Sequence, residues 1–103
     1  MEWIEKLEEN LFKIPTLIHP TSYISPSAII SSGSVIEANA VINTNSRIEK
    51  GCIISVGSII DHDAIINYGC HVDCGAVVKS YCIIAPLSRI NSDEIIKCNN
   101  LSG

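Results

Sequence analysis

The sequence contains few aromatic residues, few basic residues and no long hydrophobic run. Aromatic side chains make up 5% of the 103 residues, so the core has to be built from aliphatic side chains. Lysine and arginine total 7 against 11 acidic residues, without a basic cluster to neutralise phosphates, and we expect no nucleic-acid partner. Turn residues interrupt every apolar stretch before the ~20 residues that a transmembrane helix needs, so we expect no membrane span.

The N-terminus also lacks the pattern of a secretory signal peptide. Glu2, Glu5, Glu8 and Glu9 fall in the region where such a peptide has its basic and apolar parts. We therefore expect a cytoplasmic protein.

The sequence does have a six-residue repeat. An isoleucine or valine stands at every sixth position, and a small side chain follows four residues after each of them until Glu94. Neither a helical nor a plain strand period keeps that spacing, which is the signature of a parallel β-helix. Three hexads make one triangular coil of about 18 residues, so residues that far apart are expected to stack. The aliphatic positions are Ile18, Ile24, Ile30, Ile36, Ile42, Ile48, Ile54, Ile60, Ile66, Val72, Val78, Ile84, Ile90 and Ile96.

Each hexad predicts a three-residue strand, such as 58–60 and 64–66, whose middle residue points outward because side chains alternate along a strand. On one face the outward residues form an apolar column. Such a strip on the outside of a small prism indicates an interface, and the triangular cross-section favours a homotrimer. The column consists of Tyr23, Val41, Ile59, Val77 and Ile95.

Three segments are expected: an amphipathic helix over 1–14, a β-helix over 15–97 and a polar tail over 98–103. In the first, Trp3 and Leu7 share one helical face while the glutamates lie on the other. This short N-terminal α-helix is expected to cap the first coil, whose open backbone edge could otherwise pair with another chain. Packing on a partner protein is the alternative. The predicted fold class is all-β.

The five cysteines do not have the spacing of a zinc site, because no CxxC pair occurs. Cys52, Cys70 and Cys82 fall on the small position of the hexad and are expected to be core residues. Cys52 and Cys70 would stack within disulfide reach, but in a reducing cytosol we expect free thiols.

Two histidines are candidates for chemistry. His62 lies in a predicted turn between Asp61 and Asp63, and a carboxylate beside an imidazole can hold its Nδ1 proton and make the ring more basic. His62 is therefore a candidate general base, with a solvated polar turn as the alternative. His71 is an outward residue within an aliphatic column, which suggests a binding role, with an interface histidine as the alternative.

Nine residues, half a coil, separate the two histidines. Within one subunit His62 is expected at a corner and His71 on the opposite face, more than ~10 Å away. They could share a site only across a subunit boundary. Ser80 and Arg89 are expected one coil above His62 and His71, in the same groove.

The stretch PTLIHPTSYISPSA, the hexads after it and SIIDHDAIINYGCHVDCGA resemble the left-handed β-helix acyltransferases. The resemblance is closest to the bacterial sugar acetyltransferases of the sialic acid O-acetyltransferase (NeuD/PglD) type, and it covers about residues 15–80. It implies a left-handed β-helix, acetyl-CoA as co-substrate, and a small-molecule sugar acceptor, free or nucleotide-linked, acetylated on an amine or a hydroxyl.

The resemblance also implies roles for individual residues. His62 matches the catalytic base that deprotonates the acceptor, and Asp63 matches the acidic residue that raises its basicity. His71 matches the position that contacts the thioester end of acetyl-CoA from the neighbouring subunit. A backbone N–H near Ser80 would hold the developing oxyanion, and Arg89 completes the expected cofactor-binding set.

Two other functions remain open. Relatives of this type have an N-terminal nucleotide-sugar domain and further C-terminal coils, where this sequence has a short helix and loses its pattern at Glu94. A catalytically silent trimeric scaffold or accessory subunit is therefore the alternative. A zinc-dependent hydratase would need three histidines around one ion. The third histidine, His19, is expected two coils below the others, so we expect no metal.

Overall fold

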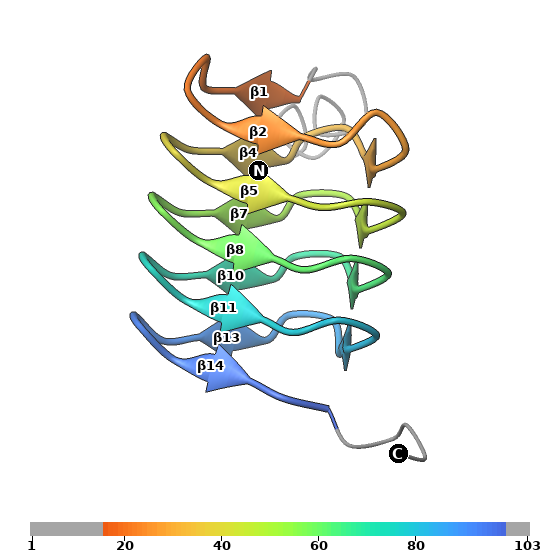
Figure 1. Cartoon of the computed structure of the whole chain (residues 1–103), viewed down its shortest axis with the longest axis vertical. Coiled ribbons are helices and arrows are strands. Elements are labelled where there is room, and N and C mark those ends of the chain that lie inside the picture. The colour runs from red at the N-terminus through yellow and green to blue at the C-terminus, as the bar shows by residue number, and fades with distance from the viewer. Residues whose placement is uncertain (1–15, 99–103) are drawn as a thin grey trace, which may run out of the picture.

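The computed structural model describes residues 16–98, and this part of the chain is a stack of triangular β-coils (Figure 1). Each coil contributes short strands joined by tight turns, as the hexad period predicts. The strands are β1 (Leu17–Ile18), β2 (Tyr23–Ile24), β3 (Ile29–Ile30), β4 (Val35–Ile36), β5 (Val41–Ile42), β6 (Arg47–Ile48), β7 (Ile53–Ile54), β8 (Ile59–Ile60), β9 (Ile65–Ile66), β10 (His71–Val72), β11 (Val77–Val78), β12 (Ile83–Ile84), β13 (Arg89–Ile90) and β14 (Ile95–Ile96).

Every third strand pairs in parallel, which gives three sheets. The first sheet has the order β1-β4-β7-β10-β13, the second β14-β11-β8-β5-β2, and the third β12-β9-β6-β3. Successive strands of the first and second sheets lie one beneath another in Figure 1. The register joins His71 to Ile53 on one side and to Arg89 on the other, so residues one coil apart stack as predicted.

The core is a column of aliphatic side chains inside the prism. In the middle coils these positions are 0% or 1% exposed, and burying one such side chain contributes roughly 1.5–3 kcal/mol. The small positions complete the filling: Cys52, Cys70 and Cys82 are buried among them, as expected. The most deeply buried aliphatic residues are Ile36, Ile42, Ile48, Ile54, Ile60, Ile66, Val72 and Val78.

The strands are two residues long rather than three, because the small residue belongs to the turn. The Ser58 N–H donates to the Ser55 carbonyl at 3.1 Å, and the Ala76 N–H donates to the Asp73 carbonyl at 3.2 Å. These bonds close the turn on the small residue itself. The predicted strand 58–60 therefore begins at Ile59.

The turns place every sixth residue in the left-handed backbone region. Glycine, asparagine or aspartate, which tolerate this conformation, fill most of these positions. Tyr81 at φ 64° and Leu87 at φ 62° are bulky exceptions. The positions are Gly33, Asn39, Asn45, Gly51, Gly57, Asp63, Gly69, Gly75, Tyr81, Leu87 and Asp93.

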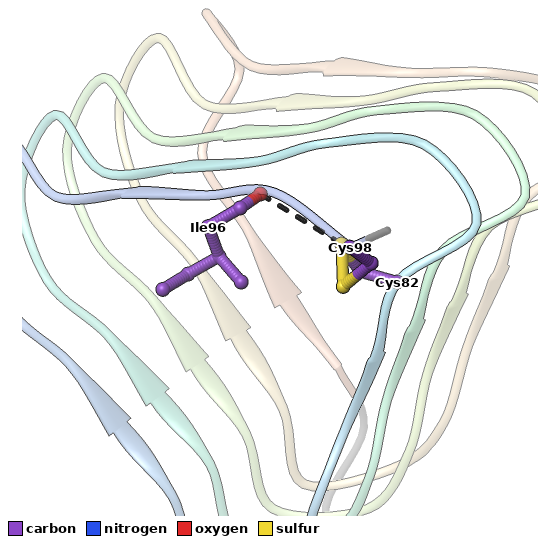
Figure 2. The surroundings of a disulfide bond; sticks show 3 residues. All are labelled: Cys82, Ile96 and Cys98. Carbon is purple, nitrogen blue, oxygen red and sulfur yellow. Dashed lines mark hydrogen bonds between the residues drawn. A yellow bond between two sulfur atoms is a disulfide. The ribbon is translucent and has the colours of Figure 1, made fainter. Parts of the chain in front are cut away.

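A disulfide joins Cys82 to Cys98 at the C-terminal end of the solenoid, with the Cα atoms 5.3 Å apart (Figure 2). Ile96 lies beside the bond, in the last strand. Sequence analysis did not anticipate this pairing, because Cys98 was assigned to the polar tail. Cys52 and Cys70 are free thiols, as expected.

The predicted helix over 1–14 and the tail after Cys98 lie outside the described residues. Within residues 16–98, no helix is long and apolar enough to cross a bilayer. Glu94, where the small-residue pattern stops, is exposed, and its Oε1 accepts a hydrogen bond from the Asn91 N–H at 2.9 Å. Its side chain thus closes its own turn rather than entering the core.

Candidate active site

His62 lies at the corner between β8 and β9, where the second and third sheets meet. Its Nδ1 is 2.9 Å from Asp63 Oδ2, and the two side chains are 46% and 33% exposed. An ionised carboxylate can only accept, so Nδ1 carries the hydrogen and Nε2 carries the lone pair of the neutral ring. The pair therefore has the arrangement that a general base requires.

The turn itself holds this pair in place. Asp61 Oδ1 accepts a hydrogen bond from the His62 N–H at 2.8 Å. Asp63 adopts the left-handed conformation at φ 57°, and its N–H donates to the Thr44 carbonyl of the coil below at 2.9 Å. Because both backbone positions are fixed, the Asp63 carboxylate stays beside the imidazole.

Ser80 and Tyr81 form the same corner one coil higher. The Tyr81 N–H donates to the His62 carbonyl at 3.3 Å, so the predicted stacking of this turn on His62 is confirmed. The Ser80 N–H has no acceptor among residues 16–98. The N–H of Thr44, which lies at the same corner one coil below His62, also has no acceptor in this part of the chain. Ser80 is half-buried, and a free N–H one coil above a candidate base can donate to a developing oxyanion.

His71 lies on β10, in the first sheet, with its side chain 35% exposed. Its Nε2 is 3.2 Å from the Oγ of Ser55, a buried residue, and 4.0 Å from Asp73 Oδ1. Arg89 Nη2 donates to Asp73 Oδ2 at 2.8 Å. This hydrogen bond, with a second from the Cys74 N–H, lowers the pKa of Asp73 below its ordinary value.

The structure separates the two histidines within one chain. The corner of His62 joins the second and third sheets, whereas His71 lies on the first sheet, which is the opposite side of the triangle. His71 and Arg89 do come together, since they are paired neighbours on β10 and β13. His62, Asp63 and Ser80 form one group, and His71 and Arg89 form another.

Three residues of these groups were not predicted from the sequence. Ser55 and Asp73 contact His71, and the ring of Tyr81 meets that of His62 edge-on, with centroids 5.4 Å apart and planes at 88°. Tyr81 could have been noticed as an aromatic residue one coil above Asp63, at a turn position that mostly takes glycine, asparagine or aspartate.

Solved structures that are similar to this chain include acetyltransferases. The chain aligns over 99% of its length with 58% of the acetyltransferase domain of PglB from Neisseria gonorrhoeae, at 28% identity and a TM-score of 0.70. That domain was also solved with acetyl coenzyme A, and there the TM-score is 0.58. The chain has the left-handed β-helix fold of these acetyltransferases.

A second acetyltransferase of this fold is a perosamine N-acetyltransferase variant from Caulobacter crescentus, solved with CoA and GDP-perosamine. The match has 24% identity and a TM-score of 0.70, and it covers 91% of this chain and 50% of that one. The chain thus spans 50% of the Caulobacter chain and 58% of the Neisseria chain. No protein-family model and no curated protein matches the sequence.

The zinc-dependent alternative would require side chains that converge on one ion. No three His, Cys, Asp or Glu residues between 16 and 98 converge as metal ligands. His19 follows β1, where its Nδ1 lies 3.0 Å from Thr21 Oγ1.

Proposed function

We propose that the protein is an acetyl-CoA-dependent acetyltransferase that acts on an amine or hydroxyl of a sugar, free or nucleotide-linked. The observation that carries the proposal is the His62–Asp63 pair at a solenoid corner, with the free Ser80 N–H one coil above it. Two neighbours support this class of substrates, since one holds acetyl coenzyme A and the other holds CoA and GDP-perosamine.

The chemistry needs one base and one oxyanion donor. His62 Nε2 takes a proton from the acceptor as its nitrogen or oxygen attacks the thioester carbonyl. The Ser80 N–H donates to the oxyanion of the tetrahedral intermediate, which is held best by a fixed dipole in the protein. The intermediate expels the CoA thiolate, which recovers the proton from the imidazolium, so no covalent enzyme intermediate forms.

A homotrimer would complete the site. The outward column of the second sheet is apolar throughout, and in the single chain Tyr23 is 53%, Ile59 38% and Ile95 55% exposed. Packing this column against a second copy would bring the His71 sheet of one subunit to the His62 corner of another. His71 Nδ1, which makes no hydrogen bond within residues 16–98, would then be available to the thioester end of the cofactor.

Arg89 would bind the anionic part of the cofactor only after its guanidinium leaves the Asp73 carboxylate. In the free chain its guanidinium is held by Asp73, and its side chain is 61% exposed. This exchange costs little, because an ion pair near the surface contributes little to stability.

The test is acetyl transfer, measured as release of the CoA thiol with a panel of free and nucleotide-linked amino and hydroxy sugars. Replacing the base, His62→Ala, is expected to lower kcat by about 10²–10⁴ with little change in acetyl-CoA binding. His19→Ala is the matched control and should keep the wild-type rate. Equal rates for both variants would reassign the base. Absence of transfer to every acceptor, from a protein that forms trimers, would favour the silent scaffold instead.

A further inference from the structure

Tyr81 is the aromatic residue that contacts His62 within the described chain, and the proposed mechanism gives it no role. The rings meet edge to face at 5.4 Å, and the Tyr81 N–H donates to the His62 carbonyl. The tyrosine comes from the next coil, so ring and backbone both tie that coil to the corner of the base. Tyr81 is 45% exposed, so it lies at the surface where a substrate would arrive.

The backbone of Tyr81 is unusual in a way that points to function. At φ 64° it stands in the left-handed region, which a bulky side chain rarely adopts. Most turns of the solenoid put glycine, asparagine or aspartate at this position. A large residue kept in an unfavourable conformation beside a candidate base suggests that the ring itself has a task there.

The ring supplies a restraint that His62 otherwise lacks. The imidazole is 46% exposed, and its one side-chain hydrogen bond, from Nδ1 to Asp63, fixes a single ring atom. An imidazole held at one atom can still swing about that bond. A second contact, on the ring's side, limits the swing and keeps Nε2 pointing in one direction.

We propose that Tyr81 is a positioning residue that, together with Asp63, holds the His62 imidazole in its reactive orientation. The proposal rests on the acetyl transfer proposed above. The aromatic ring carries the effect, since the contact is between rings and the phenol hydroxyl has no hydrogen-bond partner among residues 16–98.

Kinetics of two substitutions separate ring from hydroxyl. Tyr81→Leu keeps a residue type that already occupies a left-handed turn position at Leu87, so the backbone can accommodate it. It is expected to lower kcat about ten- to a hundredfold with an unchanged KM for acetyl-CoA, because a misaligned base slows only the chemical step. Tyr81→Phe should keep nearly the wild-type kcat. Tyr68→Leu, the same change at another exposed turn tyrosine, is the control and should change neither constant.

A spectroscopic readout tests the ring contact without relying on activity. In NMR spectra the ring current of Tyr81 should displace the His62 ring-proton signals, equally so in Tyr81→Phe. In Tyr81→Leu these signals should move toward random-coil positions, while Tyr68→Leu leaves them in place.

Three results would overturn the positioning role. The first is that the His62 signals are unchanged in Tyr81→Leu, and the second is that kcat is unchanged in this variant. The third is that the substitution changes only the KM for the acceptor, which would make Tyr81 an acceptor contact. An active wild type with an unaffected Tyr81→Leu removes this inference alone. A wild-type rate in His62→Ala instead removes the proposed base, and the positioning role with it.

Discussion

At the scale of single residues, Asp73 connects the groups proposed to meet acetyl-CoA. Its two oxygens lie 2.8 Å from Arg89 Nη2 and 4.0 Å from His71 Nε2. The Arg89 hydrogen bond lowers the pKa of Asp73, so the carboxylate stays ionised well below neutral pH. An ionised Asp73 therefore competes with any cofactor phosphate for Arg89.

Asp73→Asn is expected to strengthen CoA binding a few-fold, because it frees the guanidinium at the small cost of an exposed ion pair. Calorimetric titration with CoA measures the change, and Asp93→Asn, at an exposed turn of the next coil, is the control. A folded-state pKa below the ordinary ~3.9 means that protonation frees Arg89 only in acid, so this pair should add no pH dependence between about pH 6 and 8. Unchanged affinity in Asp73→Asn would show that Arg89 does not meet the cofactor.

Of the contacts in the candidate site, sequence reasoning predicted the one between His62 and Asp63, but not the one between His71 and Asp73. His62 and Asp63 are adjacent, so their contact follows from the turn alone. Ser55 and Tyr81 approach their histidines from other coils, and whether a side chain of a neighbouring coil turns toward a histidine depends on its rotamer. The hexad period fixes which residues stack but says nothing of rotamers, which is why these contacts were missed.

At the scale of the elements, the repeat was sufficient to predict the strands, their parallel stacking and the buried column. The core of each coil is built from the aliphatic and the small positions, and both recur every six residues. Strand length was overestimated because the turn bond, such as Ser58 N–H to the Ser55 carbonyl, depends on turn geometry. The Cys82–Cys98 bond was missed because Cys98 follows the last aliphatic position, where the period gives no information.

That disulfide should stabilise the C-terminal coil. It closes a loop with a sequence separation of 16, for which the loss of chain entropy in the unfolded state corresponds to about 3 kcal/mol. We expect Cys98→Ser to lower the free energy of unfolding by up to that amount in urea denaturation under oxidising conditions. Cys74→Ser, at an exposed free cysteine, is the control. Identical midpoints for Cys98→Ser and wild type would show that the bond does not form in solution.

At the scale of the whole molecule, the two histidines are too far apart in one chain to share a site. A triangular prism has three corners and three faces, and His62 at a corner lies opposite the face of His71. At any one place, a single chain therefore offers either the proposed base or the proposed cofactor contact, but not both. Assembly through the apolar column of the second sheet would be favourable, since burying the column removes exposed apolar surface from water.

Mixing two inactive variants, His62→Ala and His71→Ala, tests most directly whether the site is shared between subunits. Each is first shown to be inactive and, by light scattering, to have about three times the 11.1 kDa mass of the chain. After joint dissociation and reassembly, a heterotrimer can contain a boundary with His62 from one parent and His71 from the other. A site shared between subunits predicts that acetyl transfer returns in the mixture and not in either variant reassembled alone. Heterotrimers confirmed by native mass spectrometry but without activity would contradict the shared site.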